Sequence, residues 1–330
     1  MQAIILHDDL AADARADELD VFAQAEVFET VLRDMGYTCR RMPFALDLGR
    51  VRDELSANRP DLVVNLVEAV GGQGSLLHLA PALLDAFRIP YTGASTAALL
   101  LTTDKLAAKR LLTMRKLPTP PWTGRRGGWP IADLPPGRYV IKPVAEEASV
   151  GLDDDAVVEV SDPTELSGLM RDRSERLGLD VFAERYVEGR EFNLSILGGG
   201  GEPEVLPIAE IQFVDYAPGR PRLVGYRAKW DADSFEYHHT PRCFEFPRKD
   251  DALLAELGRF ARECWALFEL RGYVRVDFRV DGKGRPWILE INANPCIAPD
   301  AGFLAAARQK GLSNAEVVRR IVRDALEPTV

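Results

Sequence analysis

Residues 272–294 read GYVRVDFRVDGKGRPWILEINAN, a pattern typical of a β-hairpin. VRVDFRV alternates in the manner of a half-buried strand, DGKG has the composition of a turn, and PWILEIN is a second apolar run. Because residues two apart on a strand share a face, Glu290 and Asn292 are expected to point the same way and Ile291 into the core. Asp277 then lies on the adjoining strand, so three oxygen donors are predicted to face one point.

Carboxylate and amide oxygens of this kind suit a cation that also holds phosphate oxygens, as Mg²⁺ does in nucleotide enzymes. The sequence therefore predicts a magnesium site formed by Asp277, Glu290 and Asn292. The alternative is an ordinary exposed strand face that carries acids, and the hairpin alone does not separate the two interpretations.

Two further segments have the composition of a nucleotide site. Residues 140–152, VIKPVAEEASVGL, place Lys142 after an apolar run and before a loop of small residues, whose N–H groups can hold phosphate oxygens. Residues 182–197, FAERYVEGREFNLSIL, place Glu184 and Glu191 on either side of a hinge that can offer backbone edges to adenine and a carboxylate to ribose. A common glycine loop and a plain hairpin are the respective alternatives.

Composition limits the class of protein. A chain of 330 residues with 46% hydrophobic content is long enough for two or three domains, and a net charge of −10 without a basic stripe argues against nucleic acid as a partner. No leader or run of transmembrane length occurs, so we expect no membrane partner. The cysteines, at positions 39, 243, 264 and 296, lack CxxC spacing, which argues against zinc or a disulfide framework and favours a reducing cytoplasm.

Alternating apolar runs and amphipathic stretches predict a parallel α/β unit at the start of the chain. Its expected strands are QAIIL, YTCRRMPF and DLVVNLV, with helices near 16–35 and near Val51. Further helices are expected at 104–115, 163–177, 251–268 and 314–326, and the proline- and glycine-rich stretch 117–137 reads as a connection. The predicted domains are 1–101, 102–186 and 187–330.

In this order and spacing the motifs resemble the ATP-grasp superfamily, and most closely its D-alanine:D-alanine ligase group. The matching segments are IPYTGAST, TTDKLAAKRLL, KP with the loop ending ASVGL, ERYVEGREF, PIAEIQF, GYRAKW, VRVDFRV and ILEINANP. The resemblance covers nearly the whole chain. It implies an α/β and α+β fold of three domains, with an N-terminal parallel α/β domain and ATP between the middle and C-terminal domains.

The resemblance also implies an activity, the ATP-dependent joining of a carboxylate to an amine through an acyl phosphate, with Mg²⁺ or Mn²⁺ as the metal and small molecules as substrates. Homodimers are usual in the family. The implied ATP-binding residues are Lys105, Lys142, Ser149, Glu184, Arg185, Tyr186, Val187, Glu191 and Lys229. The implied catalytic residues are Arg275, which steadies the acyl phosphate and oxyanion, with Lys229, Ser149 and Glu18.

Some of these roles have structural alternatives. Glu18 lies near the family's glutamate that holds an amino group, but acids at a helix start are also ordinary capping partners. Arg275 is two residues from Asp277 on one strand face and can instead pair with Glu290. Cys296, where the family generally has glycine, is interpreted as packing rather than as a reactive thiol.

Departures from the family pattern concern the substrate pocket more than ATP. They are Ala148 in place of one of two adjacent serines, Trp230 in place of tyrosine, Glu68 near an expected histidine, and Ala301 and Gly302 in place of serine and leucine. These changes put D-alanine itself in doubt as a substrate.

The leading interpretation is a ligase that forms a peptide or amide bond between small amino-acid-like substrates. The alternatives are a conventional D-alanine:D-alanine ligase of cell-wall synthesis and a nucleotide-binding regulator without turnover, although the intact phosphoryl-transfer residues speak against the regulator. A dehydrogenase is set aside because no GxGxxG follows the first strand. His238 and His239, in the loop after Trp230, are weighed as proton acceptors for the amine and as solvated bystanders.

Overall fold

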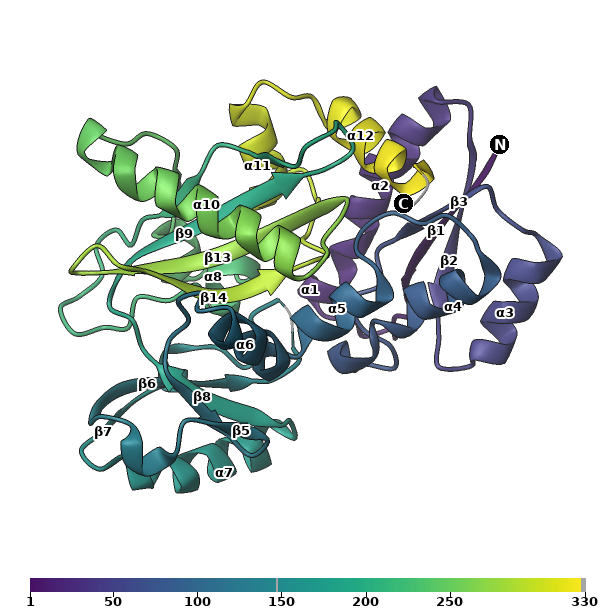
Figure 1. Ribbon diagram of the computed structural model, residues 1–330. Helices are drawn as coiled ribbons and strands as arrows, with labels where there is room; N and C mark the ends of the chain where they lie inside the picture. Colours follow the sequence, from purple (N-terminus) through teal and green to yellow (C-terminus); the bar gives the residue numbers. More distant parts are fainter. Residues whose placement is uncertain (147, 328–330) are drawn as a thin grey trace.

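The computed structural model describes residues 1–146 and 148–327, which form three β-sheets with their covering helices (Figure 1). Residue 147 of the predicted phosphate loop and residues 328–330 lie outside the described part of the chain. The mixture of one parallel and two antiparallel sheets confirms the predicted α/β and α+β class.

The first sheet is parallel, with strand order β2-β1-β3. Its strands are β1 (Gln2–Asp8), β2 (Thr38–Phe44) and β3 (Leu62–Asn65), and its helices are α1 (Ala16–Leu19), α2 (Val21–Asp34), α3 (Leu48–Ala57) and α4 (Leu79–Phe87). The single helix expected over 16–35 is interrupted at Asp20, which ends α1 and begins α2. The alternation of strand and helix predicted for this part of the chain is confirmed.

The end of the chain returns to this first sheet. The helices α11 (Gly302–Gln309) and α12 (Asn314–Leu326) share one hydrophobic core with α2 and β1, and Figure 1 shows α12 beside α2. Ser313 and Glu316 form a capping box that begins α12, which satisfies backbone donors that a helix start leaves free. The predicted helix 314–326 is thereby confirmed.

The second sheet is antiparallel, with strand order β5-β4-β8-β6-β7. Its strands are β4 (Trp122–Gly124), β5 (Gly127–Gly128), β6 (Gly137–Pro143), β7 (Val157–Val160) and β8 (Val181–Arg185). Helix α7 (Leu166–Leu177) packs on this sheet and ends at Gly178, whose φ of 67° suits glycine. The helix predicted over 163–177 is confirmed, with a 3₁₀ turn at its start.

The third sheet has strand order β12-β11-β9-β13-β14, with β10 on β9. Its strands are β9 (Gly189–Leu197), β10 (Glu204–Val205), β11 (Ala209–Ile211), β12 (Arg242–Cys243), β13 (Tyr273–Asp281) and β14 (Pro286–Asn292). Its core is shared with α5 (Thr96–Thr103), α6 (Lys105–Met114) and α10 (Asp251–Leu267), and Figure 1 shows α10 lying across the strands. Along the chain, the short helices α8 (Tyr226–Trp230) and α9 (Phe235–His238) follow β11 and precede β12.

Asp8, at the end of β1, holds the segment after β3 in place. Its Oδ1 accepts hydrogen bonds from the backbone N–H groups of Glu68 and Ala69, at 2.8 Å and 3.1 Å. Burial raises the pKa of Asp8 from 3.8 to about 6 despite these hydrogen bonds. The folded chain therefore binds this proton more tightly than the unfolded chain does, so ionisation of Asp8 costs stability above pH 6 and costs nothing below pH 3.8.

We expect Asp8→Asn to raise the free energy of unfolding at pH 7.5 by about 1–3 kcal/mol, because asparagine keeps an acceptor oxygen and carries no charge. The gain over the wild type should shrink as the pH is lowered to about 4.5. Urea unfolding at a series of pH values measures this difference, and Asp9→Asn at the exposed neighbouring position reports the effect of removing one charge here. A gain that does not vary with pH contradicts the burial argument.

Candidate active site

A cavity of about 520 Å³ lies where the second and third sheets face each other, and it reaches the first sheet's loops. Every predicted ATP, metal and catalytic residue except Glu18 lines it. These residues are Lys105, Lys142, Ser149, Glu184, Arg185, Tyr186, Val187, Glu191, Lys229, Arg275, Asp277, Glu290 and Asn292. Segments that are up to 187 residues apart in the sequence therefore meet at one place, from Lys105 to Asn292 (292 − 105 = 187).

Glu18 lies elsewhere and has the structural role that was its alternative. Its carboxylate accepts a hydrogen bond of 2.7 Å from the backbone N–H of Arg15 and completes a capping box at the start of α1. Asp20, two residues later, lines the cavity instead. The prediction that Glu18 binds a substrate amino group is therefore not supported by its position.

The hairpin of β13 and β14 brings the three predicted metal ligands together. Asp277 is paired directly with Glu290, and Arg275 with Asn292. Ile291 is buried, as predicted from the alternation of the strand. A β-bulge follows, since Phe278 pairs with Ile288 and leaves Leu289 as an extra residue that lines the cavity.

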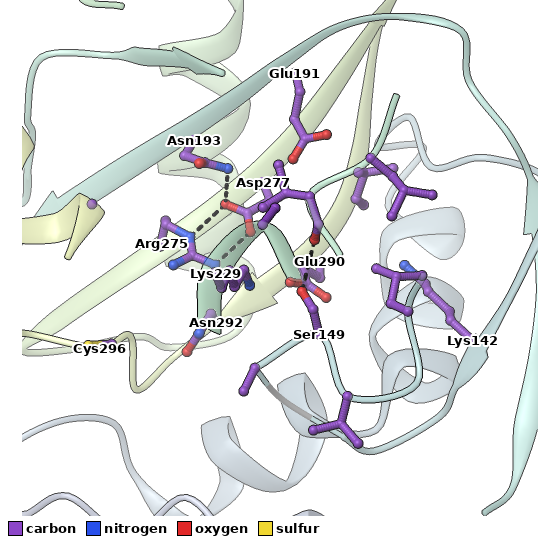
Figure 2. A pocket seen from close by; sticks show the side chains of 18 of the residues that line it. Lys142, Ser149, Glu191, Asn193, Lys229, Arg275, Asp277, Glu290, Asn292 and Cys296 are labelled. Carbon is purple, nitrogen blue, oxygen red and sulfur yellow. Dashed lines mark hydrogen bonds and ion pairs between the residues drawn. The ribbon is translucent and has the colours of Figure 1, made fainter. Parts of the chain in front are cut away.

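Asp277 is held by two neighbours from the same sheet. Arg275 donates to both of its carboxylate oxygens at 2.8 Å, and the side-chain amide of Asn193 on β9 donates to Oδ1 at 2.8 Å. Figure 2 shows Asp277 between these two side chains, with Glu290 and Asn292 on the neighbouring strand. Arg275 thus pairs with Asp277, and its charge also lowers the pKa of Glu290. The sequence did not identify Asn193, which faces Asp277 only because β9 pairs with β13.

Glu290 is surrounded by positive charge. Burial alone would raise its pKa, but the charges of Lys105, Lys142, Lys229 and Arg275 lower the pKa of Glu290 to about 2. The Nζ of Lys105 lies 3.8 Å from the Oε2 of Glu290. Glu290 is therefore ionised at neutral pH, as a metal ligand must be.

The oxygen donors on this face fit a hard divalent cation. Two carboxylates and the amide of Asn292 share one face of the hairpin, and the Oδ1 of Asn292 accepts a hydrogen bond of 3.0 Å from the backbone N–H of Asn294. Within residues 1–146 and 148–327, no three His, Cys, Asp or Glu side chains form a metal-binding group. Two carboxylates with an amide suit Mg²⁺, which takes few protein ligands and keeps positions for water or phosphate oxygens.

Glu184 lies between two lysines in the floor of the cavity. Its two carboxylate oxygens are 2.5 Å from the Nζ of Lys109 and 2.7 Å from the Nζ of Lys142. All three side chains are buried. Burial lowers the pKa of Lys109 to about 8, although the charge of Glu184 opposes the shift. For Lys142 the attraction of Glu184 and Glu290 outweighs burial, and its pKa is raised.

Lys109 was missed in the sequence analysis. The signal that identifies it is its position four residues after Lys105 on α6, because residues four apart share a helix face. Its Nζ also donates to the Thr119 hydroxyl at 2.8 Å. Both carboxylate oxygens of Glu184 are thus engaged by lysines, and the cation cluster of the cavity extends beyond the three predicted lysines.

The far side of the cavity carries a second buried acid and the lysine of GYRAKW. The carboxylate of Glu191 lies 3.6 Å from the Nε of Arg279, and burial raises its pKa. Burial and the charge of Arg275 lower the pKa of Lys229. A phosphate group or a second anion placed here would stabilise the charged form of Lys229.

The loop that follows β6 makes hydrogen bonds to α8 and to the residues just before it. Ser149 donates to the carbonyl of Val224 at 3.0 Å, and the indole N–H of Trp230 donates to the carbonyl of Ala148 at 3.1 Å. Ala148 and Ser149 have φ values of 55° and 62°, a conformation that costs energy in residues other than glycine and is commonest at functional sites. Tyr226 of α8 also donates to Asp17 of α1 at 2.8 Å. The first two contacts hold Ala148, Ser149 and Trp230, which line the cavity.

The end of the cavity nearest the first sheet is acidic. Cys296 donates its S–H to Asp20 at 2.9 Å, and the Gln24 amide donates to Asp20 and Glu68 at 3.3 Å and 3.1 Å. Burial raises the pKa of Cys296, so the thiol stays protonated and its position agrees with packing rather than reactivity. In the described part of the chain neither His238 nor His239 lines the cavity, and the ring of His239 stacks on Phe235 at 3.9 Å.

The family model described as D-ala D-ala ligase C-terminus matches residues 136–323 of this chain. The chain belongs to this family. A D-alanine–D-alanine ligase of Moorella thermoacetica is 31% identical over 86% of this chain and 88% of its own length. An uncharacterized protein of Sinorhizobium fredii is 30% identical over 81% of this chain and 75% of its own.

A solved structure of D-alanine–D-alanine ligase from Bacillus anthracis complexed with ATP shares the fold of this family member. Its TM-score is 0.72 at 18% identity, and the match covers 99% of this chain and 97% of the other. The predicted resemblance to ATP-grasp enzymes is confirmed, and the chain is an ATP-dependent ligase that forms carbon–nitrogen bonds. None of the helices in the described part of this ligase combines the length and apolar character needed to cross a bilayer.

Proposed function

We propose that this ligase joins a small carboxylic acid to a small, amino-acid-like amine through an acyl phosphate, with Mg²⁺ held by Asp277, Glu290 and Asn292. The observation that carries the proposal is the pairing of Asp277 with Glu290 in a cavity whose lysines keep Glu290 ionised. When bound to these residues, Mg²⁺ or Mn²⁺ would neutralise negative charge on the transferred phosphoryl group.

ATP would lie between the second and third sheets. Lys105, Lys142 and Lys229 supply positive charge for its phosphates, with Ser149 in the adjoining loop. We propose that the other end of the nucleotide contacts Glu184, Glu191 and the backbone of 185–187, which all line the same cavity. Glu184 can do so while it holds Lys142, since a carboxylate has lone pairs for several donors.

In the reaction, a carboxylate oxygen of the first substrate attacks the γ-phosphorus of ATP and ADP leaves. The amine nitrogen of the second substrate then attacks the acyl carbon, phosphate leaves, and the nitrogen loses a proton. Both steps concentrate negative charge on oxygen. Arg275 lies beside the metal ligands and is placed to hold the oxygen of the tetrahedral intermediate, while Asp277 keeps its guanidinium in position.

The altered pocket residues favour substrates other than two D-alanines. Ala148, Trp230, Glu68, Ala301 and Gly302 all differ from the family pattern, and all line the cavity. A conventional D-alanine:D-alanine ligase is the second candidate, supported by relatives such as the Moorella thermoacetica enzyme. The domain division at 101 and 186, a homodimer and a cytoplasmic location stay predictions.

An ADP-release assay with ATP and Mg²⁺ tests the proposal. Amino acids of both hands are screened alone, in pairs and with simple carboxylic acids, and mass spectrometry identifies the amide product. We expect release only when an acid and an amine are both present. Strong stimulation by D-alanine alone would instead assign the conventional reaction, and the absence of ADP release with every pair would contradict the ligation of small substrates.

A further inference from the structure

Arg242 is a cavity residue that the ligase mechanism does not use. It is the first residue of β12, pairs with Ile211 on β11, and lines the same cavity as Arg275. The sequence analysis did not select it, because a lone arginine before Cys243 matches no motif.

The guanidinium of Arg242 is held by a backbone carbonyl and not by an acid. Its Nη1 donates to the carbonyl oxygen of Asp300 at 3.0 Å. Among the residues that the structure describes, no carboxylate forms an ion pair with Arg242, whereas Arg275 is paired with Asp277. A guanidinium offers five N–H donors, so Arg242 keeps donors for two parallel charge-assisted hydrogen bonds to a carboxylate.

Gly302 lies next to this guanidinium. A Cβ atom added at Gly302, the first residue of α11, would lie 3.4 Å from the Nε and 3.9 Å from the Cζ of Arg242. These distances are ordinary van der Waals contacts, so residue 302 lies directly beside the guanidinium. Gly302 and Arg242 therefore line the cavity next to each other.

The charged groups near Arg242 differ from those near Glu290, which indicates the end of the cavity where Arg242 lies. Arg242 is exposed to solvent, and partial desolvation with the charges of Arg275 and Arg308 lowers its pKa, while Asp300 and Cys296 raise it. Glu290, by contrast, is influenced by Lys105, Lys142, Lys229 and Arg275. Arg275 is thus the residue common to both groups, with the phosphate-binding lysines on one side and Arg242 on the other.

Arg242 and Arg275 line one cavity, and Arg242 donates to a backbone carbonyl rather than to a carboxylate, so its free donors favour an anion bound there. We propose that Arg242 binds the carboxylate of the amine substrate, so that the acceptor is an α-amino acid or a similar amine that carries a carboxylate. This inference rests on the proposed ligase reaction and names its acceptor class. With its carboxylate on Arg242, the acceptor places its amine toward Arg275 and the acyl phosphate.

Steady-state kinetics of ADP release test the proposal with Arg242→Met. We expect the KM for the amine substrate to rise about 10- to 100-fold, as for the loss of a charge-assisted hydrogen bond, with the KM values for ATP and the acid within about twofold. In Arg242→Lys the KM for the amine substrate should rise less than in Arg242→Met. Wild-type enzyme should also discriminate, by a similar factor, between the amino acid and its carboxamide.

Arg308→Met is the matched control. Arg308 is exposed, does not line the cavity, and donates to the neighbouring backbone carbonyl, that of Pro299, at 2.8 Å. The Arg308→Met variant should leave every KM unchanged. This result would separate substrate binding by Arg242 from stabilisation of the turn at residues 299–300. Gly302→Leu keeps Arg242 but displaces its guanidinium, so it should raise the same KM.

An unchanged KM for the amine in Arg242→Met, or equal use of the carboxamide by wild type, overturns the role of Arg242 and leaves the ligase reaction standing. Equal increases in all three KM values assign Arg242 a structural role and likewise overturn the proposal. If the wild type releases no ADP with any acid and amine, the proposed function itself fails, and the acceptor assignment fails with it.

Discussion

Glu290→Gln should lower the rate of ADP release by about 10²- to 10³-fold, the size of effect seen when one group that stabilises transition-state charge is removed. Glutamine preserves the shape of the side chain and one oxygen, but it removes the negative charge that four neighbouring cations hold ionised. The affinity for Mg²⁺ should fall, because a neutral amide is a weaker ligand for a hard cation.

The dependence of the rate on Mg²⁺ concentration distinguishes this cause from general damage. We expect the Mg²⁺ concentration for half-maximal rate to rise in Glu290→Gln, and the far-UV circular dichroism to match that of the wild type. Glu263→Gln, at an exposed position on α10, is the matched control and should leave both quantities unchanged. A Glu290→Gln enzyme with wild-type rate and Mg²⁺ dependence would remove Glu290 from the proposed metal site.

Glu184→Gln should lower the free energy of unfolding by about 3–5 kcal/mol, the usual cost of removing one partner from a buried ion pair. The substitution leaves the ammonium groups of Lys109 and Lys142 buried without the carboxylate that lies within 2.7 Å of each. Urea unfolding at pH 7.5 measures the loss. ATP binding should weaken as well, because Lys142 loses the partner that fixes its position.

Two comparisons test whether the unpaired buried charges of the lysines cause the loss of stability. Glu188→Gln, at an exposed position, should change stability by less than about 0.5 kcal/mol. Lys109→Met combined with Glu184→Gln should recover part of the loss, since one of the stranded ammonium groups is gone.

The pH dependence of the free energy of unfolding provides a second test. A lysine whose pKa is depressed in the fold binds fewer protons than in the unfolded chain, so stability rises with pH. The pKa of Lys109 is already lowered to about 8, and removal of the Glu184 charge should lower it further. The deficit of Glu184→Gln should therefore narrow as the pH rises toward about 8, because in that range Lys109 has lost its proton in the folded variant but keeps it in the folded wild type. A deficit that widens as the pH rises toward 8 would contradict this account of Lys109.

Local patterns in the sequence determined much of the fold and part of the site. The two-residue period of strands placed Glu290 and Asn292 on one face, and the structure pairs Asp277 with Glu290 on that face as expected. The expected helices at 163–177 and 314–326 have capping boxes at their starts, which are local signals that a sequence carries by itself.

Other features depended on which segments pack together. Lys109 meets Glu184 only because α6 lies against the second sheet, and Asn193 meets Asp277 only because β9 pairs with β13. The bulge that turns Leu289 into the cavity breaks the two-residue period that strand prediction assumes.

By itself, the sequence determined the family, the hairpin and a set of residues that line the cavity, because short-range periodicity and motif spacing encode them. Only the tertiary structure decided that Asp20 rather than Glu18 reaches the cavity, and that Arg242 lies beside Gly302. The physical reason is that a side chain's neighbours across the fold are set by packing between distant segments. A helix interruption at one residue or the absence of one Cβ atom changes which side chain enters the site.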